Sequence, residues 1–414
     1  MNSFVLREAS VLDESGGFEG PTDVAVEDGV IVAVGPNAGA VSGPSHDFAG
    51  LWVLPGMFDC HLHAVATSLD TMQLLRTPLS ERILEAGSIL RRTLEAGVTF
   101  VRDAGGADAG IRDAIERGYV AGPRLQVAVT FLSQSGGHFD GFLPGPGVEV
   151  STNYQIPDYP GRPPYLVDGS EEMRKAVRRL LRSGADWIKL ATTGGIMSAY
   201  GEGPSAEFTP EEIATAVAEA GRRGKGVMAH SFGGEGLRNS VLAGVRSIEH
   251  GLFLTEEDAR LMAERGCWLV PTLSVINNLI RRADRGELPD FAARKLQAIR
   301  PHLGEAVGIA RQYGVRIALG TDFIAREQHG RNLGEIAYVA DAGLTPEEAL
   351  LAATRGGAEL CGVGDRYGRI APGCVFDAIV IDQSPEDLAF ARGAGVSGVF
   401  KGGVSVVRHP RLTA

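Results

Sequence analysis

The sequence predicts an α/β protein with two parts: a (β/α)8, TIM-like barrel over residues 55–369, and a small β-sandwich domain composed of residues 1–54 and 370–414. The middle of the chain alternates short apolar segments with helical stretches eight times, which is typical of a barrel of parallel strands. Both ends instead alternate apolar and polar residues, as half-buried strands do. Fifty-six glycines suit the many tight turns of such a fold.

The eight barrel strands are placed by their apolar runs. Between them lie stretches with apolar residues three and four positions apart, such as 80–97 and 170–184, which predict amphipathic helices. Gly97 and Gly184 are typical of helix ends. We expect the strands at residues 56–63, 98–104, 125–131, 186–192, 226–231, 246–251, 267–273 and 315–322.

The two ends of the chain resemble each other in pattern. Residues 4–13, 23–29 and 30–35 read as short strands, and Asp28-Gly29 is a hairpin signal. The last part returns to this style in CVFDAIVID and VSGVFKGGVSVVRH. We therefore expect both ends to build one small β domain into which the barrel is inserted.

Composition excludes several partners. A formal net charge of −11 argues against nucleic acid, because phosphate binding needs a basic face. There is no run of 18 apolar residues and no signal-peptide pattern, so we expect no membrane span and a cytoplasmic location. The four cysteines show no CxxC spacing, which predicts buried, reduced thiols.

The stretch from 133 to about 168 interrupts the barrel rhythm. It is rich in glycine, proline and aromatic residues and follows the third predicted strand. A loop of this length is usually functional or disordered. Its aromatic content favours an ordered loop that contacts substrate.

Polar residues fall at or near the ends of five predicted strands. In a barrel, the carboxyl ends of the strands converge on the active-site face. His61 and His63 are two positions apart, so both rings point to one side and can bind one metal. A single histidine at a strand end is more often a core residue, and Asp322 alone could be a helix N-cap. Their combination predicts one shared site, formed by His61, His63, Lys189, His230, His250 and Asp322.

Lys189 lies inside the apolar sequence Trp187-Ile188-Lys189-Leu190. Burial at such a position lowers the pKa of a lysine. A neutral amine can add carbon dioxide and become a carbamate, whose two oxygens can bridge two cations. The alternative is a lysine that pairs with an acid or extends to the strand end.

The order HxH, Lys, His, His, Asp on strands one, four, five, six and eight resembles the amidohydrolase superfamily of the binuclear-metal type. PGMFDCHLH and ALGTD resemble its signatures on strands one and eight. SQSGGH, IKLATTGGIMS, SIEHG and HGRNLGEI resemble the imidazolonepropionase-related branch. That branch includes prolidase-like dipeptidases, Xaa-Arg/Lys carboxypeptidases, ochratoxin-hydrolysing amidases, and some hydrolases of urea and carbamate herbicides.

The resemblance implies two divalent metal ions. It assigns His61 and His63 to one metal, His230 and His250 to the other, and the carbamate of Lys189 to both. Zinc is the favoured metal, and manganese, cobalt and iron suit the same donors. A bridging hydroxide would attack the substrate carbonyl, and Asp322 would carry its proton to the leaving nitrogen.

His138, in the GGH loop, is implied by the same resemblance to donate to the carbonyl oxygen, which stabilises an oxyanion. Its alternative is a surface loop histidine. The resemblance also implies a homo-oligomer.

The expected substrate is a small molecule with an amide bond. Tyr200 and Arg331 are candidates to bind a substrate carboxylate, although Arg331 could instead pair with Glu335 at helical spacing. One hypothesis is a dipeptidase, carboxypeptidase or N-acyl amino acid amidohydrolase. Another is an amidase, carbamate or urea hydrolase that accepts a non-peptide aromatic substrate. A deaminase, or a metal-binding scaffold without catalysis, fits the complete ligand set less well.

Overall fold

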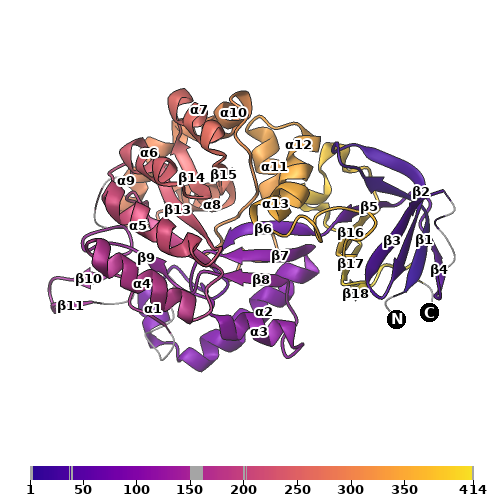
Figure 1. Ribbon diagram of the computed structural model, residues 1–414, viewed down its shortest axis with the longest axis horizontal. Helices are drawn as coiled ribbons and strands as arrows, with labels where there is room; N and C mark the ends of the chain where they lie inside the picture. Colours follow the sequence, from indigo (N-terminus) through magenta and orange to yellow (C-terminus); the bar gives the residue numbers. More distant parts are fainter. Residues whose placement is uncertain are drawn as a thin grey trace.

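The computed structural model describes residues 3–36, 38, 41–149, 162–198, 201 and 203–412. It consists of a barrel surrounded by helices and, beside it, a sheet built from both ends of the chain (Figure 1). Tyr200, the aromatics Tyr154 and Tyr159, and the rest of residues 150–161 lie outside the described residues.

The barrel wall is made of parallel strands. Hydrogen bonds group them into a sheet ordered β6-β7-β8 and a sheet ordered β15-β14-β13-β12-β9. The Asp186 amide donates to the Val127 carbonyl at 2.7 Å and joins the two groups on one side. The strands are β6 (Met57–Leu62), β7 (Val98–Asp103), β8 (Arg124–Val127), β9 (Phe131–Leu132), β12 (Trp187–Ala191), β13 (Gly226–Gly233), β14 (Ser247–Phe253) and β15 (Trp268–Val270).

The eighth predicted strand, 315–322, is not a regular strand. It makes only an isolated bridge between Leu269 and Ile317. It nevertheless closes the barrel, because the Cys60 amide donates to the Leu319 carbonyl at 2.7 Å and the Asp322 amide donates to the His61 carbonyl at 2.6 Å. Its path is set by packing: a Cβ on residue 320 would lie 2.6 Å from the Cβ of His61, so only glycine fits.

The third predicted strand, 125–131, is also interrupted. β8 ends at Val127 and β9 begins at Phe131, with Val129 between them in the left-handed region at φ 66°. β8 pairs with β7, whereas β9 pairs with β12. The interruption lets one segment complete both sides of the barrel wall.

Helices cover the outside of the barrel (Figure 1). The predicted helices over 80–97 and 170–184 are present as α2 and α4. The helices are α1 (Thr71–Arg76), α2 (Leu79–Glu95), α3 (Ala109–Glu116), α4 (Ser170–Arg182), α5 (Pro210–Gly221), α6 (Gly234–Ala243), α7 (Glu256–Arg265), α8 (Leu273–Asp284), α9 (Asp290–Ile299), α10 (Glu305–Gln312), α11 (Gly334–Asp341), α12 (Pro346–Leu351) and α13 (Gly357–Leu360). A short hairpin, β10 (Phe142–Leu143) and β11 (Val148–Glu149), lies in the long loop after β9.

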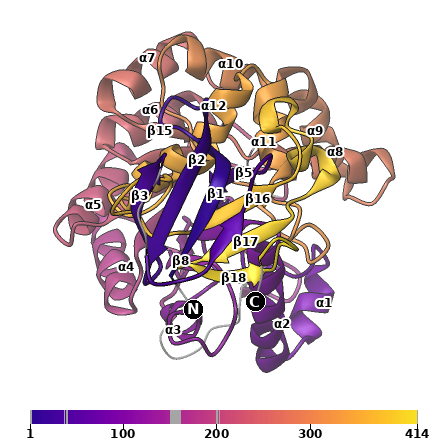
Figure 2. The same cartoon turned by 90° about the vertical axis from the view of Figure 1, so that its right-hand side faces the viewer.

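The ends of the chain form one mixed eight-stranded sheet (Figure 2). β5 pairs with β16 in antiparallel register, which joins the N-terminal and C-terminal segments. The rings of Phe4, Phe376 and Phe400 contact one another in its core. The strands are β1 (Phe4–Leu12), β2 (Phe18–Glu27), β3 (Val30–Gly35), β4 (Ser45–Asp47), β5 (Trp52–Pro55), β16 (Ala378–Ile381), β17 (Gly398–Lys401) and β18 (Val404–Val407).

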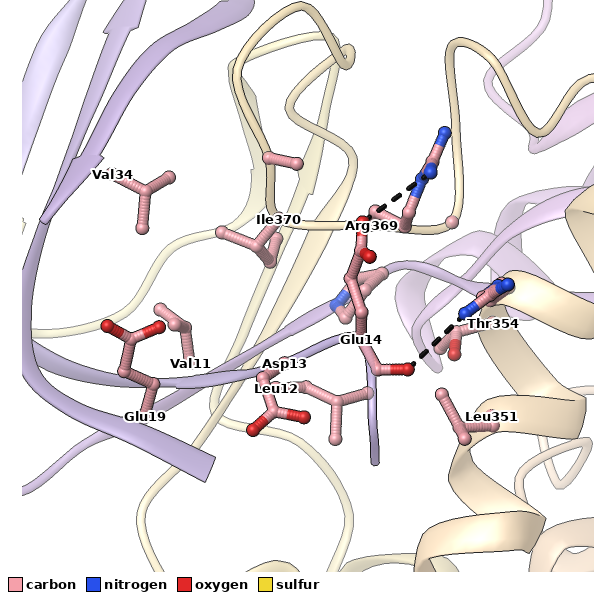
Figure 3. Close-up of a pocket in the computed structure, with 14 residues that line it drawn as sticks. Val11, Leu12, Asp13, Glu14, Glu19, Val34, Leu351, Thr354, Arg369 and Ile370 are labelled. Carbon is pink, nitrogen blue, oxygen red and sulfur yellow. Dashed lines mark hydrogen bonds and ion pairs between the residues drawn. The ribbon is translucent and has the colours of Figure 1, made fainter. Parts of the chain in front are cut away.

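A small cavity marks where this sheet meets the barrel helices (Figure 3). Glu14, in the turn after β1, lies between two arginines. Its carbonyl oxygen accepts a hydrogen bond from Arg355 at 3.4 Å, and its carboxylate lies 3.6 Å from Arg369. Leu12 and Leu351 line the same cavity from the two sides. The residues that line this cavity include none of the site residues predicted from the sequence.

The cysteines and the helices agree with the expectations from composition. Cys60, Cys267, Cys361 and Cys374 are all buried free thiols. Among the described residues, no helix combines the length and the hydropathy needed to span a lipid bilayer.

Candidate active site

The structure brings the six predicted ligands together at one end of the barrel. His61 lies on β6 and His63 directly follows it, Lys189 lies on β12, His230 on β13 and His250 on β14, while Asp322 ends the segment that closes the barrel. Oδ1 of Asp322 lies 3.1 Å from Nε2 of His63 and 3.5 Å from Nε2 of His61. Nζ of Lys189 also lies 3.5 Å from Nε2 of His61.

His61 is oriented from behind by Glu249. Nδ1 of His61 lies 2.6 Å from Oε2 of Glu249, which is fully buried. The same carboxylate accepts hydrogen bonds from the buried guanidinium of Arg102 at 2.9 Å and from the Ser247 hydroxyl at 2.5 Å. A carboxylate can only accept, so Nδ1 of His61 carries the proton and Nε2 offers its lone pair to the site. Glu249 and Arg102 are functional residues that the sequence analysis missed.

The other three histidines are oriented in the same way by neighbouring oxygen atoms. Because carbonyl oxygens only accept, the ring nitrogens of His63 and His230 that face them must be protonated. His63 and His250 therefore present Nε2 to the site, whereas His230 presents Nδ1. The contacts are His63 Nδ1 to Gly105 O at 2.8 Å, His250 Nδ1 to Thr272 Oγ1 at 2.6 Å, and His230 Nε2 to Gly194 O at 3.1 Å.

This donor set fits divalent cations. Ligand atoms of His61, His250 and Asp322 all lie within 4.8 Å of one another. Imidazole nitrogens and a carboxylate oxygen are ligands that zinc, manganese, cobalt and iron accept. Each histidine has one nitrogen fixed by an acceptor or hydroxyl and the other directed inward, which is how metal-binding histidines are held.

Burial keeps most of these histidines neutral. It lowers the pKa of His250 to about 4 and the pKa values of His61 and His230 well below their usual range. Burial also lowers the pKa of His63, but the hydrogen bond and charge of Asp322 outweigh it and raise that pKa. Burial raises the pKa of Asp322, but its electrostatic interactions with His61 and His63, including the hydrogen bond to His63, outweigh burial and lower that pKa. Neutral imidazoles and an ionised carboxylate are the forms that bind metals.

Lys189 lies in the centre of this group. Its side chain is 1% exposed, and burial lowers the pKa of its ammonium to about 8 even though Glu249 and Asp322 act in the opposite direction. The neutral amine is therefore far more populated near physiological pH than in an exposed lysine. A neutral amine is the form that reacts with carbon dioxide.

Unusual backbone conformations occur where the strands end. His250 has φ 77°, Thr272 has φ 53° and Asp322 has φ 52°, all in the left-handed region that non-glycine residues rarely adopt. Asp59 fixes the last of these turns, because its carboxylate accepts from the Thr321 hydroxyl at 2.6 Å and the Thr321 amide at 3.0 Å. Such strained positions cluster at functional sites.

His138 lies over the site as the sequence analysis expected it to. Its ring stacks on His230 with centroids 4.2 Å apart and an interplanar angle of 23°. The His138 amide donates to the carboxyl group of Glu207 at 2.9 Å, while its buried Nδ1 has no hydrogen-bond partner within the described part of the chain. Burial lowers the pKa of the His138 ring to about 3, so the ring is neutral and carries one N–H that can donate.

The cavity above the polar cluster is mostly apolar. Among the described residues, Lys189 is the only lysine or arginine in its lining. The apolar lining comes from α8, from the loops after β9 and β12, from β13 and from the segment after Asp322. It consists of Phe139, Ile196, Met197, Phe232, Val275, Ile276, Leu279 and Ile324.

Arg331 does not lie in this cavity, which corrects its assignment as a carboxylate partner. It is exposed and lines a separate cavity beside α11. The alternative pairing with Glu335 is also wrong, because the buried Glu335 carboxylate accepts the amides of Leu273 and Ser274 at 2.7 and 2.6 Å. Glu335 thus holds the start of α8. The other candidate, Tyr200, lies outside the described residues.

A closed barrel that gathers imidazole and carboxylate groups at its strand ends has the arrangement of an enzyme site that could hold a metal ion. A sequence model of the Amidohydrolase family matches residues 52–406, and the chain belongs to this family. It is accordingly a hydrolase that acts on amide carbon–nitrogen bonds.

Three proteins of known activity are similar to this chain over most of its length. An ochratoxinase of Aspergillus niger is 34% identical over 364 residues, which cover 85% of this chain and 75% of that protein. A crystal structure of a prolidase in complex with N-methylphosphonate-L-proline is 31% identical, with a TM-score of 0.89 and coverage of 98% and 100%. A crystal structure of a Xaa-Pro dipeptidase with bound methionine is 29% identical, with a TM-score of 0.87 and coverage of 97% and 99%.

Proposed function

We propose that this enzyme hydrolyses dipeptides or N-acyl amino acids that carry a large apolar group beside the scissile amide. The observation that carries this proposal is the apolar wall of the cavity that also contains the polar cluster. Helix α8 contributes Val275, Ile276 and Leu279 to this wall. Burying apolar surface of a substrate there would contribute about 25 cal/mol per Å². The similarity to a prolidase and a Xaa-Pro dipeptidase supports a peptide-like substrate.

The metal ligands divide into two groups within this proposal. His61 and His63 would hold one cation, zinc being favoured, and His230 and His250 a second, with Asp322 on the first and a carbamate of Lys189 between them. When bound, the two cations would polarise the amide carbonyl and lower the pKa of water. The carbamate supplies the negative charge that a neutral lysine lacks.

Asp322 is proposed to move the proton. Its carboxylate is ionised before the reaction, because its interactions with His61 and His63 lower its pKa. As the C–O bond forms, Asp322 takes the proton of the attacking water, and it delivers that proton to the amide nitrogen as the C–N bond breaks. The leaving amine would be expelled far more slowly without this proton.

His138 is proposed to stabilise the negative charge that develops on the carbonyl oxygen. Its neutral ring carries an N–H that can donate a hydrogen bond to that oxygen. Its stacking on His230 places it beside the cluster. Gly195 restricts this ring further, since a Cβ there would lie 2.0 Å from its Cε1. A donor held in advance in a site that excludes water is worth more than the same donor in solution.

A substrate screen tests the proposal. The protein, loaded with zinc or manganese in the presence of bicarbonate, is assayed against N-acetyl amino acids and Xaa-Pro dipeptides. We expect higher kcat/KM for phenylalanine, leucine and methionine derivatives than for aspartate or lysine derivatives. Equal rates on charged and apolar derivatives would contradict the apolar wall as the selective element.

One observation favours a second candidate, an amidase or a carbamate or urea hydrolase. The described lining offers no arginine and no lysine other than Lys189 to pair with a substrate carboxylate. Comparing N-acyl amino acids with their methyl esters and primary amides separates the two. Loss of activity on the ester and amide indicates recognition of a free carboxylate, whereas retained activity favours the second candidate.

A further inference from the structure

Lys295 is a buried lysine outside the barrel strands. It lies on α9, and only 7% of its surface is exposed. Its Nζ donates to three backbone carbonyl oxygens: Gly195 at 3.0 Å, Ser198 at 3.0 Å and Gly201 at 2.6 Å. Three carbonyl oxygens match the three N–H bonds of an ammonium group.

The backbone that Lys295 holds contacts the active site directly. The carbonyl oxygen of Gly194 accepts the N–H of His230, which fixes the ring nitrogen that His230 directs inward. Gly195 packs against the ring of His138 so closely that no side chain fits between them. The next two residues, Ile196 and Met197, line the cavity. One loop therefore sets the place of a metal ligand, of the proposed oxyanion donor and of the apolar wall.

Packing alone does not account for a lysine at this position. α9 packs through an apolar cluster that includes Ala292, Leu296 and Ile299. Burying an ammonium is costly unless its donors are paired, and a methionine would fill similar space without that cost. The ammonium group of Lys295 instead binds three carbonyl oxygens, whose partial negative charges would otherwise repel one another.

We propose that Lys295 is a positioning residue for amide hydrolysis, which acts through the loop after β12 on His230 and His138. The expected effect on kcat rests on the proposed function. The expected effect on the orientation of His230 does not, because that orientation can be followed through a bound metal without any substrate.

The test compares Lys295→Met with Arg294→Met, a substitution at the neighbouring exposed position of α9. We expect Lys295→Met to lower kcat roughly 10- to 100-fold, as loss of groups that orient ligands does, with a smaller change in KM. It should also alter the visible absorption spectrum of the cobalt(II)-loaded protein and retain less metal after dialysis. Lys295→Arg, which keeps charge and donors, should restore part of both properties, and Arg294→Met should behave as wild type.

Gly195→Ala provides an independent variant in case Lys295→Met does not fold. Its methyl group would displace the His138 ring, so kcat should fall although Lys295 is intact. The proposal is overturned if folded Lys295→Met keeps the wild-type kcat and cobalt spectrum, or if Gly195→Ala is fully active. If the wild type turns over no amide, the proposed function fails, while the cobalt spectrum and metal retention still decide the role of Lys295.

Discussion

Replacing Glu249 by glutamine would test the buried network behind the site. The Glu249 carboxylate and the Arg102 guanidinium are both fully buried and lie 2.9 Å apart. The same carboxylate accepts a hydrogen bond from Nδ1 of His61. Glu249→Gln removes the charge and leaves that of Arg102 uncompensated. Breaking a buried pair on one side costs 3–5 kcal/mol, and because glutamine keeps one acceptor we expect a loss of about 3 kcal/mol.

The assay is urea unfolding of the metal-free protein, together with metal retention of the loaded protein. Glu359→Gln is the matched control, because Glu359 forms a half-exposed ion pair with Arg355 that should contribute only about 0.5 kcal/mol. Glu249→Gln should in addition weaken metal binding roughly 10- to 100-fold, since a single amide oxygen would have to serve Arg102, Ser247 and the Nδ1–H of His61. Equal unfolding midpoints for the two variants, with unchanged metal retention, would refute the reasoning.

Three further predictions concern single carboxyl and amine groups. Asp322→Asn should lower kcat by about 10²- to 10⁴-fold, because an amide cannot shuttle the proton; near wild-type turnover in a metal-loaded variant would contradict this. Lys189→Ala should lose both metal and activity, and added acetate should restore part of each if a carbamate is what the site needs. Burial raises the pKa of Glu207 from 4.5 to about 8, so the folded state binds the extra proton and stability should fall as pH rises between those values. Glu207→Gln should remove up to about 1.4 kcal/mol per pH unit of that slope in urea unfolding, and an unchanged slope would show that another group causes it.

The barrel and its ligands could be predicted because both leave a local pattern. Each predicted strand except 315–322 overlaps a strand of the structure, although 125–131 is split. Those two deviate for steric reasons that periodicity does not show: Gly320 packs against His61, and Val129 adopts a left-handed conformation. Apolar runs predict where a strand lies, whereas hydrogen-bond register depends on contacts between distant segments.

The groups that orient the ligands could not be predicted in the same way. Glu249 directly precedes His250 and Asp59 lies two positions before His61, so their proximity to ligands was visible, but their partners were not. Lys295 lies 100 or so residues from the loop that it holds, and no spacing links the two. Arg331 illustrates the converse error, because its guanidinium suggested a partner for a substrate carboxylate whereas the residue lines a different cavity.

The buried pair of Glu249 and Arg102 also indicates what the barrel interior is selected for. Replacing both partners of such a pair by apolar side chains is often neutral or stabilising, so stability does not require it. The charged pair, however, gives the Nδ1–H of His61 a buried acceptor, which apolar side chains would not provide, and so fixes which nitrogen points to the site. In our proposal Lys295 acts in a comparable way, because its ammonium binds the carbonyl oxygens of Gly195, Ser198 and Gly201, in the same loop as the Gly194 carbonyl that accepts from His230. In both places a costly buried charge lies behind the group that fixes the direction of a histidine ring.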